Sequence, residues 1–461
     1  MRTISPIAIT AFLLALGVPA LSLDYACIDP VVEARAIWID AGAIPKTADG
    51  IRKLVRSCRQ ANLNVLFPEV ICRGYAVYPS KHLARDPRFA GAPDPLPVMI
   101  REAHRLGMEV HPWVWVFRAG YAKRPIPPGI DTWRDGANMG AILSAHPDWA
   151  ELSKDASLGQ DVSLGRDLKS RPSEKGGGLW ISPVIPAARD FLAALFAEVV
   201  TCYEIDGLHL DCIRYEVESK SPYGYSPASR ALFAKQYGID PRDIDDIPIH
   251  QYEWRKFRER QINTFVQRIG LQTRSIKPNV KLSAAVGPIP DEARSELMQN
   301  WANWTDNKWL DLVVPMAYSS DDPHFGRMVA RERDSVKDSA LLLPGIGFFS
   351  QKDPQQIVRQ IALARDGGAV GQALFAASYL TRERRETLVN GPYSRPSLLP
   401  FKSPRVCAGI LCQRAKALRS KGECEEADYL ASLAETLTRF ADSREARTPY
   451  VPPTPPPLTN P

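Results

Sequence analysis

One short segment gathers side chains that acid–base chemistry needs. It reads Asp206-Gly-Leu-His-Leu-Asp211-Cys-Ile-Arg214-Tyr215. Side chains alternate between the two faces of a strand, so His209 and Asp211 share one face and leucines occupy the other. If the leucines pack under helices, Asp211 points into the interior, where an unpaired carboxylate is costly. We therefore expect Asp211 to act in catalysis, and an ion pair with Arg214 is the structural alternative.

A second carboxyl group is needed if the reaction is cleavage of a glycosidic bond, because that bond is flanked by a proton donor and a second carboxyl group. Glu69 stands near the end of the apolar run Asn64–Val70 and is the leading candidate. A salt bridge with Arg73 is its structural alternative. Three further carboxyl groups stay open for this role, namely Asp321, Asp322 and Glu216.

Aromatic and polar side chains near these carboxyl groups suit a carbohydrate ligand. Sugar rings lay their C–H faces on aromatic rings, and their hydroxyl groups bond to carboxylates, imidazoles and guanidinium groups. Core packing is the alternative for each aromatic residue and for each histidine. The candidate ligand contacts are His209, Arg214, Tyr215, His111, Trp113, Arg73, Tyr75, Tyr318, Asp40 and Asp321.

Apolar runs of strand length alternate with longer amphipathic stretches over most of the chain. Such alternation favours a parallel sheet, and about eight strand units favour a closed (β/α)8 barrel over an open sheet. The expected strands are Arg35–Asp40, Asn64–Val70, Met108–Val116, Asp206–Ile213, Val280–Val286, Leu312–Tyr318, Leu341–Phe348 and Ala369–Phe375, with a strand-like segment at Trp180–Val184. Expected helices include Asp49–Ala61, Leu96–Leu106, Pro186–Tyr203 and Tyr252–Ser275.

The ends of these strands would place the candidate residues. Active sites of such barrels lie at the carboxyl ends of the strands. Asp40 ends the first expected strand, Glu69 lies near the end of the second, Asp211 lies on the fourth and Tyr318 ends the sixth. We therefore expect these side chains to meet at one mouth of the barrel.

The 461 residues divide into four expected segments. Residues 1–22 combine a positively charged start, an apolar run and small residues before a cleavage point, which is typical of a secretory signal peptide rather than an uncleaved anchor. Residues 33–395 are expected to form the barrel with long insertions. Residues 397–441 are expected to form a small helical hairpin that packs on the barrel or binds a protein partner. Residues 442–461 are rich in proline and are expected to form a disordered tail.

Composition excludes several classes of protein. Hydrophobic residues make up 45% and charged residues 24%, which is ordinary for a globular protein and excludes global disorder, collagen and a multi-span membrane protein. The net charge of +6 is too diffuse to favour nucleic acid. Together with the expected signal peptide, this predicts a secreted or periplasmic protein that keeps no membrane segment after cleavage.

The cysteines indicate the compartment of the protein, and the absence of cofactor motifs limits the chemistry that it can perform. Eight cysteines fit an oxidising compartment, and the nearby Cys407, Cys412 and Cys424 predict a local disulfide bond. No spacing typical of zinc ligands is present, and the first strand–helix turn lacks the Gly-x-Gly-x-x-Gly pattern of dinucleotide sites. We therefore expect neither a metal nor an organic cofactor.

The segment Asp206–Tyr215 resembles the DGxHxDxxRY signature of the glycosyl hydrolase-like 10 family. Further segments resemble the same family in the same order, so that the resemblance runs from about Glu33 to Asn390. These segments are Arg73–Ser80, His146–Trp149, the stretch around Trp254-Arg255, and Val313–Tyr318.

The resemblance implies a barrel related to glycoside hydrolases and usually exported by bacteria. It also implies action on amino-sugar polymers, including peptidoglycan glycan strands stripped of their peptides. Asp211 matches the signature aspartate and is carried over as the leading catalytic carboxylate. Glu69 departs from many relatives, which have glutamine or an apolar residue there, so its candidacy rests on its own position and chemistry.

Three hypotheses about function follow. The first is a glycosidase that cuts a bacterial amino-sugar glycan by carboxylate acid–base catalysis. The second is a glycan-binding protein on the same barrel without catalysis. The third is a scaffold that binds a partner through the C-terminal hairpin and tail. We favour the first.

Overall fold

The structure is a computed structural model that describes residues 31–122, 133–134, 137–154, 178–218, 222–244, 248–337, 339–351, 353–402 and 404–445. The predicted signal peptide, residues 1–22, lies outside this part of the chain. Residues 446–461 of the predicted tail lie outside it as well.

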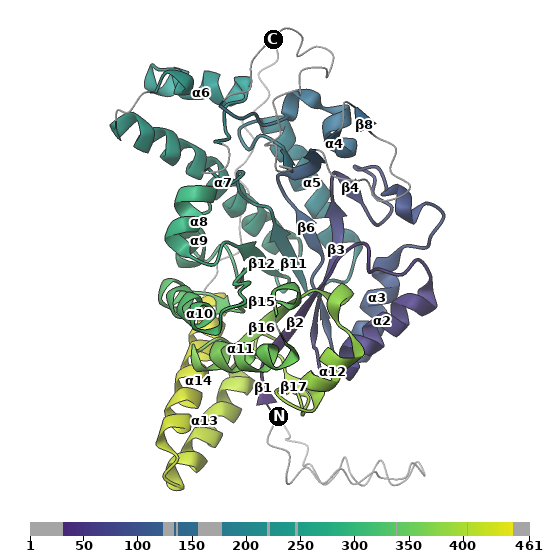
Figure 1. The fold of residues 1–461 in the computed structure, drawn as a ribbon, viewed down its shortest axis with the longest axis vertical. Coiled ribbons are helices and arrows are strands. Elements are labelled where there is room, and N and C mark those ends of the chain that lie inside the picture. The colour runs from purple at the N-terminus through teal and green to yellow at the C-terminus, as the bar shows by residue number, and fades with distance from the viewer. Residues whose placement is uncertain are drawn as a thin grey trace, which may run out of the picture.

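A parallel sheet curls into a barrel at the centre of the molecule (Figure 1). Its strands are β2 (Ala34–Ile39), β3 (Val65–Cys72), β5 (Glu109–Val110) with β6 (Trp113–Trp115), β11 (Gly207–Asp211), β12 (Lys281–Val286), β13 (Leu312–Pro315), β14 (Leu341–Leu342) with β15 (Gly345–Gly347), and β16 (Gly371–Phe375). Their hydrogen-bonded order is β14-β13-β12-β11-β6-β3-β2-β16-β15.

The barrel closes at its seventh position. The outer members of the order, β14 and β15, are separated on the chain only by Leu343 and Pro344. The Leu343 N–H donates to the Val313 carbonyl at 3.0 Å, and the Ala373 N–H donates to the Pro344 carbonyl at 3.0 Å. One chain segment therefore bonds to β13 on one side and to β16 on the other, which confirms the predicted (β/α)8 barrel.

Apolar strands and surrounding helices follow from the sequence pattern. The strands β2, β3 and β12 are buried along their whole length, as expected of parallel strands covered on both faces. Pro112 and Pro344 have no N–H to donate, and they lie where the third and seventh expected strands break into two pieces. The helices that follow the strands are α2 (Ala48–Gln60), α3 (Pro95–Arg105), α5 (Pro186–Cys202), α7 (Pro248–Ile276), α8 (Pro290–Leu297), α9 (Trp301–Asp306), α10 (Asp322–Val336), α11 (Pro354–Asp366) and α12 (Arg382–Val389).

Two insertions stand at the end of the barrel toward which β3 points (Figure 1). The first contains β7 (Arg118–Ala122), β8 (Trp133–Arg134), β9 (Ala137–Asn138), α4 (Gly140–Ala145) and β10 (Gly178–Trp180). Its strands form an antiparallel sheet in the order β10-β7-β9-β8. The segment expected as a strand at Trp180–Val184 therefore contributes only Trp180, and it does so outside the barrel. The second insertion contains α6 (Pro227–Tyr237).

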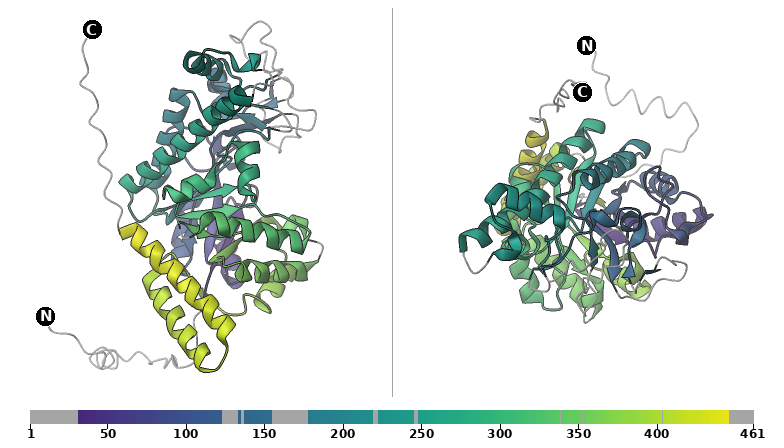
Figure 2. Two further views of the ribbon diagram at one scale, coloured as in Figure 1. Left: turned by 90° about the vertical axis from the view of Figure 1, so that its left-hand side faces the viewer. Right: turned by 90° about the horizontal axis from the view of Figure 1, so that it is seen from above.

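The other end of the barrel is covered by C-terminal elements (Figure 2). The short strands β1 (Val31–Val32) and β17 (Ser397–Leu398) pair there, and the helices α13 (Pro404–Ser420) and α14 (Cys424–Glu445) form a hairpin. Buried leucines of the hairpin, such as Leu411 and Leu437, belong to the same hydrophobic core as the barrel. The hairpin is therefore packed on the barrel.

The cysteines in the described ranges are all free thiols. Cys407 is buried and Cys412 is exposed, because five positions along a helix place two side chains on different faces. The structure thus does not show the disulfide bond expected among Cys407, Cys412 and Cys424. In the same ranges, no helix has the length and apolar character to cross a bilayer.

One buried carboxyl group in α10 carries a stability prediction. Both oxygens of Glu332 are buried without a hydrogen-bond partner, and burial raises its pKa well above the ordinary 4.5. The folded chain therefore keeps this proton at pH values where the unfolded chain loses it, so the group's contribution to stability falls as pH rises from 4.5. Glu332→Met should raise the free energy of unfolding at pH 8 by about 1–3 kcal/mol, the cost of an unsatisfied buried polar group.

Urea denaturation of both proteins at pH 5 and pH 8 measures this effect. The gain from Glu332→Met should be larger at pH 8 than at pH 5. Glu435→Met on α14 is the control, because this glutamate is exposed and paired with Arg439. An equal gain at both pH values would show that Glu332 is not held protonated by the fold.

Candidate active site

Asp211 stands at the carboxyl end of β11 and is held there by two N–H donors. The Trp113 indole N–H donates to Asp211 Oδ2 at 3.0 Å, and the Cys212 backbone N–H donates to Oδ1 at 2.6 Å. Burial raises the pKa of Asp211 above its ordinary value, while the Cys212 N–H, the Arg214 charge and the Trp113 N–H oppose the rise. Each carboxylate oxygen of Asp211 is thus held by one donor, and the two donors favour the ionised form of Asp211.

Glu69 lies across Trp113 from Asp211, at the corresponding level of β3. Glu69 pairs in register with Trp113, which belongs to the strand between β3 and β11. The Glu69 side chain is 2% exposed, and Oε2 accepts the Ala41 N–H at 2.7 Å. Burial raises its pKa to about 7, and the negative charges of Asp40 and Asp211 add to the rise. Glu69 is therefore a carboxylic acid that keeps a proton near neutral pH.

Asp40 completes a row of carboxyl groups on the first, second and fourth strands. Its Oδ1 accepts the Ala43 N–H at 3.1 Å. Its Oδ2 is buried without a hydrogen-bond partner. Because the charge of Asp40 raises the pKa of Glu69, its position favours the protonated form of that acid.

The alternatives for the second carboxyl group have structural partners. Asp321 accepts the His324 N–H and caps the start of α10. Asp322 pairs with Arg359 at 2.6 Å and accepts bonds from two glutamine side chains. Although burial raises the pKa of Asp322, these bonds lower it below its ordinary value. Asp321 therefore has a capping role, and the lowered pKa of Asp322 does not suit a proton donor.

Glu216 and Arg214 lie together beside the first insertion. Glu216 accepts the Trp180 indole N–H at 3.2 Å. The Arg214 guanidinium lies 5.0 Å from the Trp180 ring centre, and its Nη1 donates to the Tyr215 carbonyl. Arg214 therefore acts on Asp211 through its charge while its hydrogen bond goes to the backbone.

His209 lies beneath the mouth and is fully buried. Its Nε2 accepts the Trp38 indole N–H at 3.0 Å, and its Nδ1 lies 2.8 Å from Ser283 Oγ. An indole nitrogen only donates, so Nε2 carries no proton and Nδ1 donates to Ser283. The ring also stacks on Phe67 at 4.2 Å, and burial lowers its pKa well below the ordinary 6.5. His209 is thus a neutral core residue and not the ligand contact that we expected.

His111 lies near the opposite end of the barrel. It bonds to Glu109 at 3.0 Å, and its ring lies 5.9 Å from Phe401 of the C-terminal segment. A Cβ on Gly207 would lie 2.3 Å from the His111 ring. The glycine of the signature segment is thus required by this histidine, which the structure does not place at the mouth.

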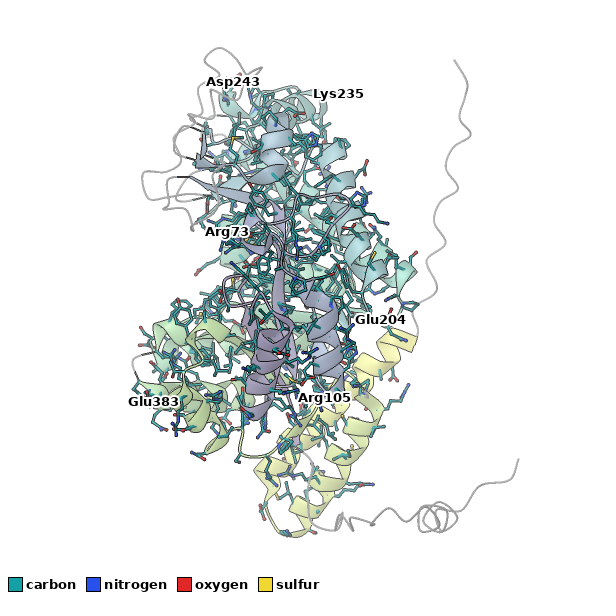
Figure 3. All side chains as sticks on the ribbon, turned by 90° about the vertical axis from the view of Figure 1, so that its right-hand side faces the viewer. Arg73, Arg105, Glu204, Lys235, Asp243 and Glu383 are labelled. Atoms are coloured by element: carbon teal, nitrogen blue, oxygen red, sulfur yellow. The ribbon has the colours of Figure 1, made fainter. Side chains whose placement is uncertain are left out.

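The expected contacts after β3 and β11 divide between the mouth and the core. Arg73 lies beside Glu69, whose pKa its charge lowers. Figure 3 shows Arg73 between the second insertion, marked by Lys235 and Asp243, and α12, marked by Glu383. Tyr75 and Tyr215 are both buried, and the Tyr215 ring faces Arg258 of α7. Tyr75 pairs with Cys72 at the end of β3 and is buried to the same degree as Trp113, so it lies beside the mouth. Tyr215 packs toward α7 instead.

Aromatic rings at the mouth extend further than the sequence indicated. Tyr318 lies 5.5 Å from Phe375, which in turn lies 6.2 Å from Trp113. Phe349, at 52% exposure, and Tyr379, at 42%, continue this group toward solvent. Phe349, Phe375 and Tyr379 are not among the ligand contacts expected from the sequence. Their position directly after β15 and at the end of β16 is the signal that identifies them.

Trp113→Phe tests the bond that orients Asp211. The substitution keeps an aromatic ring and removes one N–H, and hydrogen bonds to charged groups contribute about 1.5–3 kcal/mol. We expect kcat/KM for the reaction at this site to fall about 10- to 100-fold, and the acid limb of its pH profile to move to higher pH. Trp304→Phe is the control, because its indole N–H donates to Asn263 between α9 and α7. Equal activities of the two variants would exclude the role given to Trp113.

Sequence comparisons match the chain to glycosyl hydrolases. The family described as Glycosyl hydrolase-like 10 matches residues 33–350. The Bacillus subtilis glycosyl hydrolase YngK is 24% identical over 428 residues, covering 80% of this chain and 73% of that protein. The Escherichia coli glycosyl hydrolase DigH is 24% identical over 332 residues, covering 65% of each chain. The match thus spans just under two thirds of the second relative.

Solved structures share the fold. The glycoside hydrolase domain of PgaB (BpsB) from Bordetella bronchiseptica superposes with a TM-score of 0.55 at 14% identity, covering 77% of this chain and 99% of that domain. The catalytic domain of β-amylase from Paenibacillus polymyxa superposes with a TM-score of 0.51 at 10% identity, covering 80% of this chain and all of that domain, 100%. These likenesses concern the barrel.

Proposed function

The chain belongs to the glycosyl hydrolase-like 10 family, and from this membership we propose that it cleaves the glycan chains of a bacterial amino-sugar polymer. The candidate polymers are peptide-free peptidoglycan strands or a related exopolysaccharide. The observation that carries the proposal is the pair of carboxyl groups at the barrel mouth. One of them, Glu69, has its pKa raised to about 7, and the other, Asp211, is oriented by two N–H donors.

The pair divides the two tasks of glycoside hydrolysis. Glu69 gives its proton to the leaving oxygen as the bond to the anomeric carbon breaks. Asp211 acts as nucleophile or base, or it orients a substrate N-acetyl group that attacks in its place. Where Asp211 or the N-acetyl group attacks, water then supplies hydroxide to the anomeric carbon and its proton to Glu69. Where Asp211 is the base, water attacks directly and Asp211 takes its proton. No step uses a metal or an organic cofactor.

The proposed setting is the outside of the cytoplasm. The charged, apolar and small-residue pattern of residues 1–22 supports export, and the proposed substrates are cell-surface polymers. Binding of a protein partner at the hairpin of α13 and α14 stays a prediction.

Release of new reducing ends from peptide-free peptidoglycan strands tests the proposal. Poly-N-acetylglucosamine, intact and partly deacetylated, serves as the second substrate. Release from either polymer is the expected result. Binding of these polymers without release would favour the non-catalytic glycan-binding protein, and neither binding nor release would overturn the proposal.

A further inference from the structure

Four aromatic rings form a continuous strip from the catalytic pair to the solvent. The strip consists of Trp113, Phe375, Phe349 and Tyr379. Successive ring centres lie 6.2, 6.0 and 6.4 Å apart. Its inner end is the ring that bonds to Asp211, and its outer two rings are about half exposed.

Exposing an aromatic ring to water costs free energy, and two loops of the barrel nevertheless hold these rings at the surface. Phe349 and Tyr379 follow two different strands of the barrel, β15 and β16. Arg384 of α12 joins the two loops. Its Nη2 donates to the Phe348 carbonyl at 2.8 Å and its Nη1 donates to the Tyr379 carbonyl at 2.8 Å. The guanidinium also lies 5.0 Å from the Phe348 ring centre.

The position of the Phe349 side chain is also fixed by its neighbours. A Cβ on Gly347 would lie 2.9 Å from the Phe349 ring and 3.1 Å from the Tyr318 ring, so both rings pack directly over backbone. Ser350 donates to the Gly347 carbonyl at 2.8 Å and closes the turn. The loop thus presents Phe349 outward while its neighbour Phe348 is buried.

We propose that Phe349 and Tyr379 form a sugar-binding platform that holds a glycan unit beyond the cleaved bond. The ligand class is a chain of gluco-configured 2-amino sugars, because such rings carry their substituents equatorially and offer flat C–H faces to aromatic rings. The inference rests on the proposed function, which places the cleaved bond beside Asp211 and Glu69. Arg384 is a positioning residue, since it fixes the two loops and bonds only to their carbonyls and to Phe348.

The two sides of the mouth differ in chemistry, and this difference explains why the ligand surface proposed for Phe349 and Tyr379 is an uncharged ring face. The side near β11 carries Arg214 against Trp180, with Glu216 bonded to the same indole. Charged groups there suit the polar edge of a substrate. The side formed by β15 and β16 presents rings, with Phe349 and Tyr379 as the members open to solvent. An uncharged ring face is therefore the ligand surface that matches it.

Binding in an inactive background tests the platform. The probes are two-, four- and six-sugar fragments of peptide-free peptidoglycan and of poly-N-acetylglucosamine, titrated calorimetrically into Asp211→Asn protein. Phe349→Ala and Tyr379→Ala should each weaken binding of the six-sugar probe about 5- to 10-fold, the loss of one aromatic contact of roughly 1–1.5 kcal/mol. The loss should be smaller for the two-sugar probe, which cannot reach both the mouth and the platform.

Controls separate stacking from general damage. Tyr252→Ala removes a ring of 51% exposure that lies beside Lys256 on α7 and is not part of the aromatic strip, and it should leave binding unchanged. Arg384→Ala should weaken binding of the six-sugar probe, and Arg384→Lys should restore little, because one ammonium group does not hold both carbonyls in a planar fork. Phe349→Trp should keep or strengthen binding.

The outcomes separate the platform from the proposed function. Wild-type cleavage of the polymer together with unchanged binding in Phe349→Ala and Tyr379→Ala would overturn the platform alone. Absence of cleavage together with Phe349-dependent binding would overturn the hydrolase proposal alone. If the inactive protein binds none of the probes, the platform is wrong for this ligand class.

Discussion

Asp211→Asn is expected to lower glycan cleavage by about 10³-fold or more while the protein stays folded. The variant keeps the size of the side chain, and its single oxygen can accept either the Trp113 N–H or the Cys212 N–H, so that its NH2 group replaces the other acceptor oxygen. It loses the negative charge that attacks or activates at the anomeric carbon. Reducing-end release from the polymer, with the denaturation midpoint measured beside it, shows whether activity falls without loss of stability.

The matched control for Asp211→Asn is Asp190→Asn. Asp190 is an exposed aspartate of α5 that pairs with Arg268, so its change also removes one charge. It should leave cleavage intact. If Asp211→Asn retained wild-type cleavage, the attacking group would have to be sought elsewhere at the mouth, with Asp40 as the next carboxyl group in the row.

The sequence predicts the barrel well because parallel strands leave a direct pattern. Their residues are buried on both faces, so they appear as short apolar runs, and helices separate them. The breaks at Pro112 and Pro344 are equally local, since proline has no N–H. The closure between β13 and β16 depends instead on hydrogen bonds between distant segments, and no local pattern carries that information.

The sequence predicts the place of a site residue only where its position along a strand determines that place. The positions of Asp211 and Glu69 at the mouth follow from the strand ends, and their catalytic roles stay a proposal. His209 was misjudged because its partners, Trp38 and Ser283, come from two other strands, and only the closed barrel brings them together. The role of Asp321 was within reach, because an aspartate two residues before a proline at a helix start is a capping signal.

The exposed rings show a further limit of sequence patterns. Phe348 and Phe349 are adjacent and identical, and yet one is buried and the other is half exposed. Phe348 belongs to the core of the barrel, and Arg384, more than thirty residues away, contacts its carbonyl and ring, whereas Phe349 packs over Gly347. Composition and periodicity treat the two residues alike, so the ring group at the mouth required the folded chain.

Glu69→Gln is expected to lower cleavage of the polymer by about 10²- to 10⁴-fold, the usual contribution of a general acid. The wild-type enzyme should lose activity as pH rises through about 7, because Glu69 gives up its proton there. At low pH, activity should fall as Asp211 becomes protonated, at a pH above the ordinary pKa of an aspartate. In Glu69→Gln the decline at high pH should disappear while the decline at low pH remains.

The leaving group of the substrate decides whether Glu69 is the proton donor. A nitrophenyl glycoside releases a weakly basic phenolate that needs no proton, whereas a sugar alkoxide needs one. The loss in Glu69→Gln should therefore be much smaller on the nitrophenyl substrate than on the polymer. Glu151→Gln is the control, because Glu151 is also buried with a raised pKa, but it accepts hydrogen bonds from Ser182 and Ser226 and does not belong to the row of carboxyl groups at the strand ends. Its pH profile should keep the wild-type shape. An equal loss on both substrates in Glu69→Gln would assign this residue to positioning, and the proton donor would then be another group.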